Sequence, residues 1–284
     1  MLAATLLWGA TFVAARDLLR SVGPIELVFT RFAAATALFA LVLLVRHAAR
    51  RPLAAGVRAA LVGGAVSGML GAGGYLFQAI GLTRTSAGSS AFLTCVGTVL
   101  AALFAWPMLG QRPALTLVQG MALALAGSLL LSSRAGLAGI GIGEAWTLAG
   151  AVVFALQIVA VARWAPKADA LLLTGVQSGV VTLTLLPFAG HAAAQLSALD
   201  RPGAWRLAYL ALAGSVIAPL LQVLAQRALS AGRVALLFAL EPVFALVFAL
   251  TLGGERFAPS WWVGALLILC GVLRAEWPGR AGKS

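Results

Sequence analysis

Apolar stretches of about 20 residues recur from one end of this 284-residue chain to the other, separated by short segments rich in Arg, Pro and Gly. An α-helix needs about 20 apolar residues to cross the hydrocarbon core of a bilayer. The alternating pattern of a membrane β-strand is absent. The pattern therefore predicts an all-α membrane protein with ten transmembrane helices. The expected spans are residues 2–21, 26–45, 59–82, 87–109, 114–133, 144–163, 169–188, 206–228, 233–252 and 260–275.

Composition and charge support this class. The chain is 62% hydrophobic and 10% charged, with a mean hydropathy of +1.01, which is unlike a soluble domain of this length. A net charge of +12 would indicate nucleic acid as a partner of a soluble protein. Here the basic residues are scattered over short loops and form no basic domain. We therefore expect the protein to lie in the lipid bilayer and to bind no nucleic acid.

The basic residues also predict the orientation in the membrane. When the loops are assigned to alternating sides, 12 Lys and Arg fall on one side and 7 on the other, while Arg31 lies inside a helix. The loop "RHAARRPLAAGVR" (46–58) contributes most to the difference. Because cytoplasmic loops carry the excess of positive charge, both termini are predicted to be cytoplasmic.

The two halves of the chain match without a gap when the sequence is shifted by 144 residues. "SAGSSAFLTCVGTVLAALFAWPMLGQRPA" (86–114) then lies over "SAGRVALLFALEPVFALVFALTLGGERFA" (230–258), and Gln78 lies over Gln222. The same register pairs Gly120 with Gly264 and Gly127 with Gly271. A register that keeps Gln, Ser, Arg and Gly in place indicates an internal repeat.

The repeat has a topological consequence. Each half holds five predicted helices, which is an odd number, so the second half starts on the opposite side of the membrane and runs inverted. The expected organisation is a first repeat over residues 1–137 and a second, inverted repeat over 138–284. Inverted repeats that meet at the midplane are a transporter architecture. Because one chain carries both orientations, we expect a functional monomer.

Several motifs resemble EamA-type members of the drug/metabolite transporter superfamily, and the resemblance covers essentially the whole chain. They are "LLWGATFVA" in the first helix, "RF" at 31–32, "TSAG" at 85–88 and "LEPVFALVFALTLGGER" at 240–256. The resemblance implies a ten-helix exporter of amino acids and related metabolites, in a bacterial inner membrane. The first half departs from the pattern, because Gly97-Thr98 stand where the second half has Glu241-Pro242.

Polar side chains inside the predicted helices point to a substrate path. Such residues face a cavity or a neighbouring helix. The alternatives are structural: Ser and Thr also bond their own backbone, Gln also ties helices together, and Trp8 also suits packing. The candidates for the path are Trp8, Tyr75, Gln78, Thr94, Thr98, Trp146, Gln157, Gln177, Ser178 and Gln222.

The charge inside the helices narrows the substrate. Arg31 is the only basic residue well inside a predicted helix, and pairing with Glu26 or Asp17 would neutralise it. Phosphorylated substrates need fixed cations in the path and are therefore disfavoured. A small neutral or zwitterionic molecule is expected, with its charges met by helix ends, amides and hydroxyls.

The adjacent Glu241 and Pro242 invite two interpretations. Pro242 clashes with the carbonyl of Phe238 and predicts a kink, and Pro219 is a second hinge candidate. Glu241 either ties its helix to neighbouring helices, or it also binds and releases a proton as access alternates, which would couple transport to protons. Desolvation favours the neutral form of such a carboxyl, which could donate to the carbonyl that the proline frees.

Two other classes of function remain. A membrane-embedded enzyme is disfavoured because His47 and His191 are the only histidines and lie on opposite sides, so neither a metal site nor a Ser-His-Asp site is expected. No cofactor is expected either. A passive channel fits the same pattern of helices and remains an alternative to a carrier.

Overall fold

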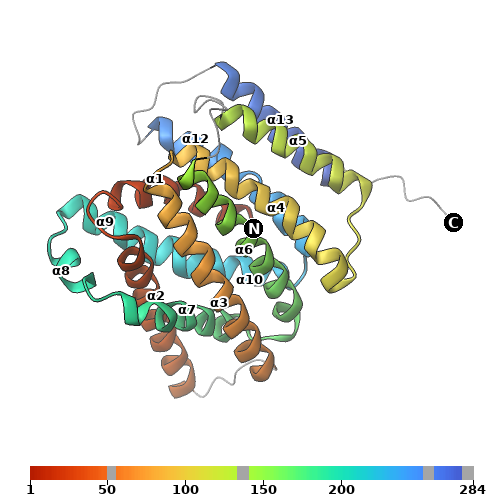
Figure 1. Cartoon of the computed structure of the whole chain (residues 1–284). Coiled ribbons are helices and arrows are strands. Elements are labelled where there is room, and N and C mark those ends of the chain that lie inside the picture. The colour runs from red at the N-terminus through yellow and green to blue at the C-terminus, as the bar shows by residue number, and fades with distance from the viewer. Residues whose placement is uncertain (50–55, 133–140, 252–258, 277–284) are drawn as a thin grey trace.

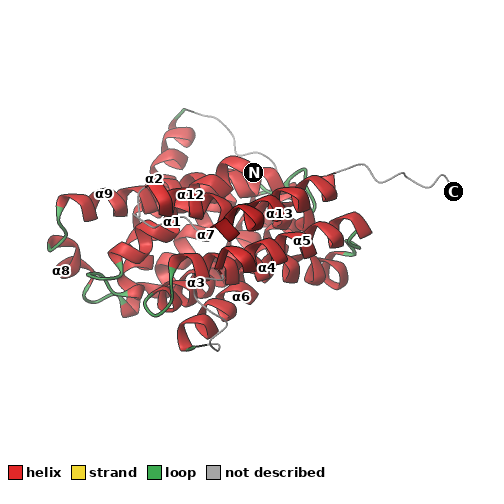
Figure 2. Cartoon of the chain, turned by 90° about the horizontal axis from the view of Figure 1, so that it is seen from above, coloured by secondary structure: helices red, strands yellow, loops and turns green. Residues whose placement is uncertain are grey.

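The computed structural model describes residues 1–49, 56–132, 141–251 and 259–276, and over these ranges it is helical without a strand (Figures 1 and 2). The predicted boundary between the repeats, at 137/138, and the "GGER" stretch lie outside the described residues. The helices are α1 Leu2–Leu18, α2 Pro24–Ala48, α3 Val57–Leu82, α4 Ala87–Leu109, α5 Leu115–Ser132, α6 Ile142–Trp164, α7 Ala170–Leu185, α8 Ala192–Ser197, α9 Arg201–Tyr209, α10 Ala218–Gln226, α11 Ala231–Phe238, α12 Glu241–Thr251 and α13 Pro259–Glu276.

These helices account for all ten predicted spans. Seven helical stretches of the described chain are long and apolar enough to cross a membrane, and four of them are composite. Two of these extend α6 and α7 by the short 3-10 helices Ala165–Lys167 and Leu186–Phe188. In Arg201–Gln226, a π-helical segment, Leu210–Ile217, joins α9 to α10, and Ala231–Phe248 combines α11 with most of α12. The shorter apolar helices Leu115–Leu130 and Trp262–Ala275, with the 17 residues of α1, complete the set. The predicted all-α membrane fold is confirmed.

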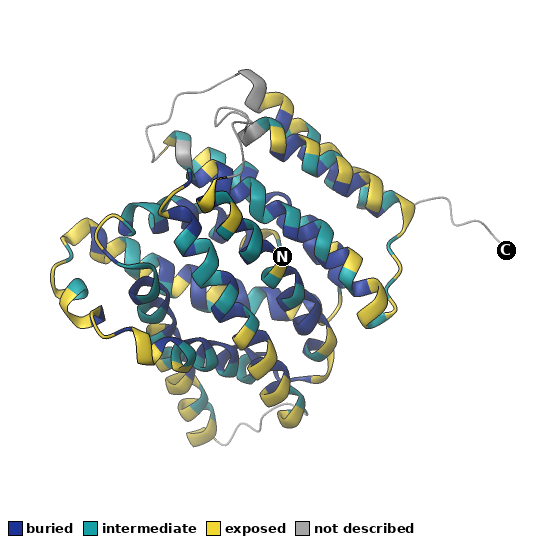
Figure 3. Cartoon of the chain, in the orientation of Figure 1, coloured by how far each residue is buried: buried dark blue, intermediate teal, exposed yellow. Residues whose placement is uncertain are grey.

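Burial follows the pattern of a membrane protein. Buried residues gather where the helices face one another, whereas exposed residues follow the outward sides of peripheral helices such as α5 and α13 (Figure 3). Large apolar side chains are among the most exposed, including Leu44, Leu183 and Leu266 at 66%, 67% and 57%. An outer surface of this kind suits contact with lipid.

The pair α5 and α13 packs side by side at the edge of the bundle (Figure 1). Gly120 lies against the carbonyl oxygen of Gly271, and Gly127 lies against that of Gly264. Residue numbers rise along one helix as they fall along the other, so the two helices are antiparallel. In the repeat register Gly120 is equivalent to Gly264 and Gly127 to Gly271, so exchanging the two halves turns one contact into the other. A two-fold axis between the repeats produces this relation.

Small residues also set the packing of α3. Gly64 and Gly68 lie close to the backbone of α7, and Gly74 lies against the ring of Phe154 in α6. A Cβ atom at Gly68 would stand 2.7 Å from the carbonyl oxygen of Gln177. Close backbone approach through small residues is the usual way that helices associate where hydrocarbon replaces water. It places α3 firmly between α6 and α7.

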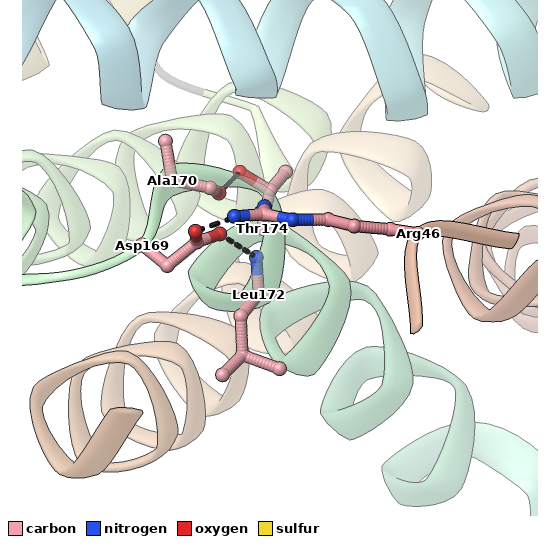
Figure 4. Close-up of polar contacts among 5 residues, drawn as sticks. All are labelled: Arg46, Asp169, Ala170, Leu172 and Thr174. Carbon is pink, nitrogen blue, oxygen red and sulfur yellow. Dashed lines mark hydrogen bonds and ion pairs between the residues drawn. The ribbon is translucent and has the colours of Figure 1, made fainter. Parts of the chain in front are cut away.

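Polar contacts tie α2 to the start of α7 (Figure 4). The Oδ1 atom of Asp169 accepts a hydrogen bond of 3.0 Å from the N–H of Leu172 and caps α7, while Oδ2 pairs with the guanidinium of Arg46 at 3.0 Å. One turn further on, Thr174 donates to the carbonyl of Ala170 at 2.8 Å. A carboxylate both caps a helix and complements its dipole, so one side chain fixes two helices of different halves.

At Pro242 the structure shows an interruption of the helix, and the kink itself stays a prediction. α11 ends at Phe238, Ala239 and Leu240 form a turn, and α12 begins at Glu241. A proline in the first turn of a helix has no hydrogen bond to lose, and a carboxylate there complements the dipole. The adjacent pair is therefore the signature of a helix start, placed inside a membrane span. Pro219 holds the corresponding second position in α10, directly after the π-helical segment.

Candidate substrate cavity

A cavity lies at the centre of the bundle, between the two halves of the chain. Its walls come from α1, α3 and α4 of the first half and from α6, α10, α11 and α12 of the second. The lining residues are Trp8, Thr11, Tyr75, Gln78, Thr94, Gly97, Thr98, Phe154, Gln157, Ile158, Gln222, Phe238 and Glu241. Both halves of the repeat thus enclose one space.

Amides form one part of the wall. The Nε2 atom of Gln78 donates to the hydroxyl of Thr94 at 3.2 Å, and the Nε2 atom of the equivalent Gln222 donates to Oε1 of Gln157 at 3.2 Å. Each glutamine is thus held by a second lining side chain from another helix. The threonine hydroxyls of Thr94 and Thr98 donate to carbonyls of their own helix, at 2.8 and 2.7 Å. They therefore offer lone pairs to the cavity.

Aromatic rings form another part. The rings of Trp8 and Phe238 pack with centroids 5.1 Å apart, and Tyr75 meets Phe154 edge to face at 5.0 Å. The indole N–H of Trp8 donates to the carbonyl of Gly214 at 3.0 Å, inside the π-helical segment. Because its only polar atom is used there, Trp8 presents an apolar face to the cavity.

Glu241 is the only carboxylate among the lining residues. It occupies the first position of α12. Its side chain has no hydrogen bond or ion pair with any other residue that the structure describes. The hydrogen bond that sequence reasoning allowed, to the carbonyl of Phe238 or to a neighbour, is therefore not found. The carboxylate stands at the interrupted span with its oxygen atoms available to a ligand.

Arg31 does not pair as predicted. Asp17 pairs instead with Arg206, at 3.3 Å between oxygen and nitrogen, and Arg31 forms no ion pair with Glu26 in the described structure. Its Nε atom donates to the hydroxyl of Ser215 at 2.7 Å, and its guanidinium lies over the ring of Tyr75, 5.0 Å from the centroid. This placement reaches across helices that are distant in the chain.

The structure separates the predicted path residues into two groups. Those that line the cavity are Trp8, Tyr75, Gln78, Thr94, Thr98, Gln157, Gln222 and Glu241. The remaining candidates, together with the two prolines, do not line it. Trp146 packs on Phe77 at 5.2 Å, Gln177 accepts a hydrogen bond of 3.0 Å from Ser67 between α3 and α7, and Ser178 is buried in α7.

Sequence reasoning missed five lining residues. Four of them, Gly97, Phe154, Ile158 and Phe238, have no polar side chain, and an apolar residue in an apolar helix gives no signal of a cavity. Thr11 could have been found, since it is polar and one helical turn from Trp8. Its hydroxyl donates to the carbonyl of Trp8 at 2.6 Å.

Ten spans, of which three from each half of the repeat line an internal cavity with polar groups, are the arrangement of a multi-pass membrane transporter. The chain belongs to the EamA-like transporter family, whose model matches residues 1–133 and again residues 141–275. The two matches follow the two halves of the repeat.

Two further comparisons found similar proteins. An "Uncharacterized transporter" from Archaeoglobus fulgidus is 27% identical over 268 residues, which cover 94% of this chain and 82% of that protein. A solved structure described only as "Crystal structure of protein" has a TM-score of 0.74 and 20% identity, covering 98% of this chain and 96% of that one. At this identity the likeness shows the fold alone.

Proposed function

We propose that the protein is a secondary exporter of amino acids or similar small neutral or zwitterionic metabolites, working by alternating access through the central cavity. The observation that carries this proposal is the cavity itself, which is enclosed by both halves and lined by amides, hydroxyls, aromatic rings and one carboxylate. Among the described residues no Lys or Arg lines it, so a phosphorylated substrate would lack the cations it needs.

The antiparallel contact of α5 with α13 supports an inverted arrangement of the two repeats in the membrane. If the halves are inverted, each can play the role of the other as access switches sides. The site of action is a bacterial inner membrane, with both termini cytoplasmic, and one chain suffices. Reporters test this: one in the 46–58 loop and one after Ser284 should be inside, and one in 189–204 outside. Labelling of a tag at residue 284 from outside intact cells would overturn the orientation.

Glu241 is the group through which export would be coupled to protons. A proton and the ammonium group of a substrate would compete for the same carboxylate, so that one enters as the other leaves. The alternative is structural, with Glu241 serving only to start α12 inside the span. The exchange of a substrate against itself needs no proton in either case, which gives a way to separate the two roles.

A passive channel is the second candidate. Purified protein in liposomes preloaded with unlabelled amino acid, and then given a trace of the labelled one, distinguishes the two. A carrier accumulates label transiently and saturates with concentration. Flux that rises linearly and shows no counterflow would establish a channel. A panel of amino acids in the same assay would identify the substrate, and no response to any of them would remove this substrate class.

A further inference from the structure

Arg31 is a buried cation without an acidic partner in the described structure. Arg31 is the eighth residue of α2 and only 5% exposed, and its Nη2 atom is buried without a hydrogen-bond partner in the described chain. Burying a charge without a counter-ion is strongly unfavourable. Gly214 leaves the space for it, since a Cβ atom at that position would stand 2.8 Å from Nη2. A chain that retains such a costly group has a use for its charge.

The charge stands directly behind one wall of the cavity. The guanidinium lies over the ring of Tyr75, and that ring lines the cavity. The Nε atom, fixed by Ser215, holds the guanidinium in place. In a low-dielectric interior the field of a charge extends well beyond its contacts. The electrons of the Tyr75 ring already attract the guanidinium on one face, so the ring attracts a second cation on its other face less strongly. The Tyr75 wall therefore disfavours an ammonium group and favours an anionic group.

The opposite charge belongs to another part of the same cavity. Glu241 lines it from α12 in the second half, whereas Arg31 and Tyr75 belong to α2 and α3 in the first half. The cavity thus has a carboxylate on its surface at Glu241 and a cation behind its surface at Tyr75. A molecule that carries both an ammonium and a carboxylate matches this pattern, with one group directed to each of these residues.

We propose that Arg31, acting through Tyr75, selects substrates that carry a carboxylate and sets their direction in the cavity. The ammonium group lies at Glu241, and the carboxylate accepts a hydrogen bond from the Tyr75 hydroxyl on the side that Arg31 makes positive. Arg31 is a positioning residue, because it does not line the cavity. This inference rests on the proposed transport function and narrows its substrate class to zwitterions.

Three labelled probes of similar shape test it: phenylalanine, its methyl ester, which keeps only the ammonium group, and its N-acetyl derivative, which keeps only the carboxylate. Counterflow in liposomes gives the ratio of phenylalanine to ester transport. The ratio should exceed one for the unaltered protein. Tyr75→Phe should lower it by about tenfold or more, as expected when a hydrogen bond to a charged group is lost. Arg31→Gln should also lower it, because the carboxylate then loses the attraction of a nearby positive charge. Transport of the ester itself should persist.

The control is Arg206→Gln. This variant removes a different arginine, which forms an ion pair with Asp17 near the end of α1 and does not line the cavity. It should leave the ratio unchanged. Arg31→Gln protein that transports both probes less, in an unchanged ratio, would make Arg31 merely structural and overturn the inference. If that variant does not fold, Tyr75→Phe decides, since it keeps the ring, and an unchanged ratio again overturns it.

Failure of the transport function looks different. If the unaltered protein transports the ester as well as phenylalanine, selection by Arg31 is refuted while the transporter proposal stands. If it transports none of the three probes, the substrate class itself fails, and the inference falls with it.

Discussion

The fourth helix of each half begins in the same way and then differs. Ser86 caps α4 by accepting from the N–H of Ser89 at 3.0 Å, and the equivalent Ser230 caps α11 by accepting from that of Arg233 at 3.4 Å. α4 then continues as one helix to Leu109 through Gly97-Thr98. Its counterpart stops at Phe238 and restarts at Glu241, after a turn of two residues.

The difference shows how a repeat acquires two roles. At the position where α4 has Gly97, the second half has Glu241, and where α4 has Thr98 it has Pro242. The third helices differ in the same sense, because α3 is regular whereas its counterpart contains the π-helical segment. Irregular helices in membranes occur at functional sites and at bends. Both irregular helices of these pairs therefore belong to the second half.

The largest expected effect is at the carboxylate that only the second half carries. If Glu241 couples transport to protons, Glu241→Gln keeps the shape of the side chain, and exchange of substrate against itself persists, with weaker substrate binding because the amide cannot form an ion pair with the ammonium group. Stimulation of transport by an imposed pH difference should fall about tenfold or more, in the range of ordinary coupling energies. The measurement is uptake into liposomes with and without the pH difference.

The control carboxylate is Glu144, which accepts a hydrogen bond of 2.6 Å from Thr85 and does not line the central cavity. Glu144→Gln should respond to the pH difference as the unaltered protein does. Full pH-driven transport by well-folded Glu241→Gln protein would leave only the structural role.

A second test removes the interruption. Pro242→Ala restores a backbone N–H and a strong helix former, so α11 and α12 should join more nearly as α4 does. If the break is a hinge, initial transport rates should fall several-fold without loss of folded protein. Pro107→Ala, in the exposed last turn of α4, is the matched control and should change nothing. A normal rate for Pro242→Ala would mean that the break is not needed for access to alternate.

The equivalent position in the first half should resist any side chain. A Cβ atom on Gly97 would stand 2.6 Å from the carbonyl oxygen of Ala151, so α4 and α6 would have to separate. Gly97→Ala should lower the free energy of unfolding by about 1–3 kcal/mol, as overpacking does. Thermal unfolding in detergent gives the shift. Gly88→Ala, which meets nothing within 4 Å in the same helix, should change it by less than about 0.5 kcal/mol. Equal shifts would contradict the close contact.

The smallest stability effect is expected where the halves agree. Gln78 and Gln222 are equivalent, and each makes one hydrogen bond to another helix. Replacing either with Ala should cost about 0.6 kcal/mol of stability, the average for such bonds in membranes, yet impair transport. Transport rates divided by the amount of folded protein separate the effect on transport from the effect on stability. A stability loss with ordinary transport by the surviving protein would reduce both glutamines to helix ties.

The predictable part of the fold is the part that each stretch of sequence decides locally. Apolar length alone identifies the spans, since lipid forces every backbone group to bond within its own helix. The break at Pro242 was not predictable in this way. A proline inside an apolar run is compatible with a kink or with a stop and restart, and packing against other helices decides between them. The π-helical segment before Pro219 gave no distinct signal either.

The site was predicted only in part, for a related reason. Polar faces of helices placed Gln78, Gln157 and Gln222 among the candidates, and all three line the cavity. Gln177 was chosen by the same rule, yet it bonds Ser67 away from the cavity. The rotation of a helix in a bundle depends on its neighbours, which one sequence does not reveal. The same limit applies to Arg31, whose partner Ser215 lies far along the chain.

The reciprocal glycine contacts of α5 and α13 have an evolutionary meaning. A surface that meets an equivalent copy of itself is isologous, the kind that closes a symmetric dimer. A short ancestral chain with one such helix could have paired with a second copy inserted the other way up. Duplication and fusion of its gene would then join the two copies without inventing a new contact. Only afterwards would one copy be free to change, acquiring a carboxylate and a proline where the other kept glycine and threonine.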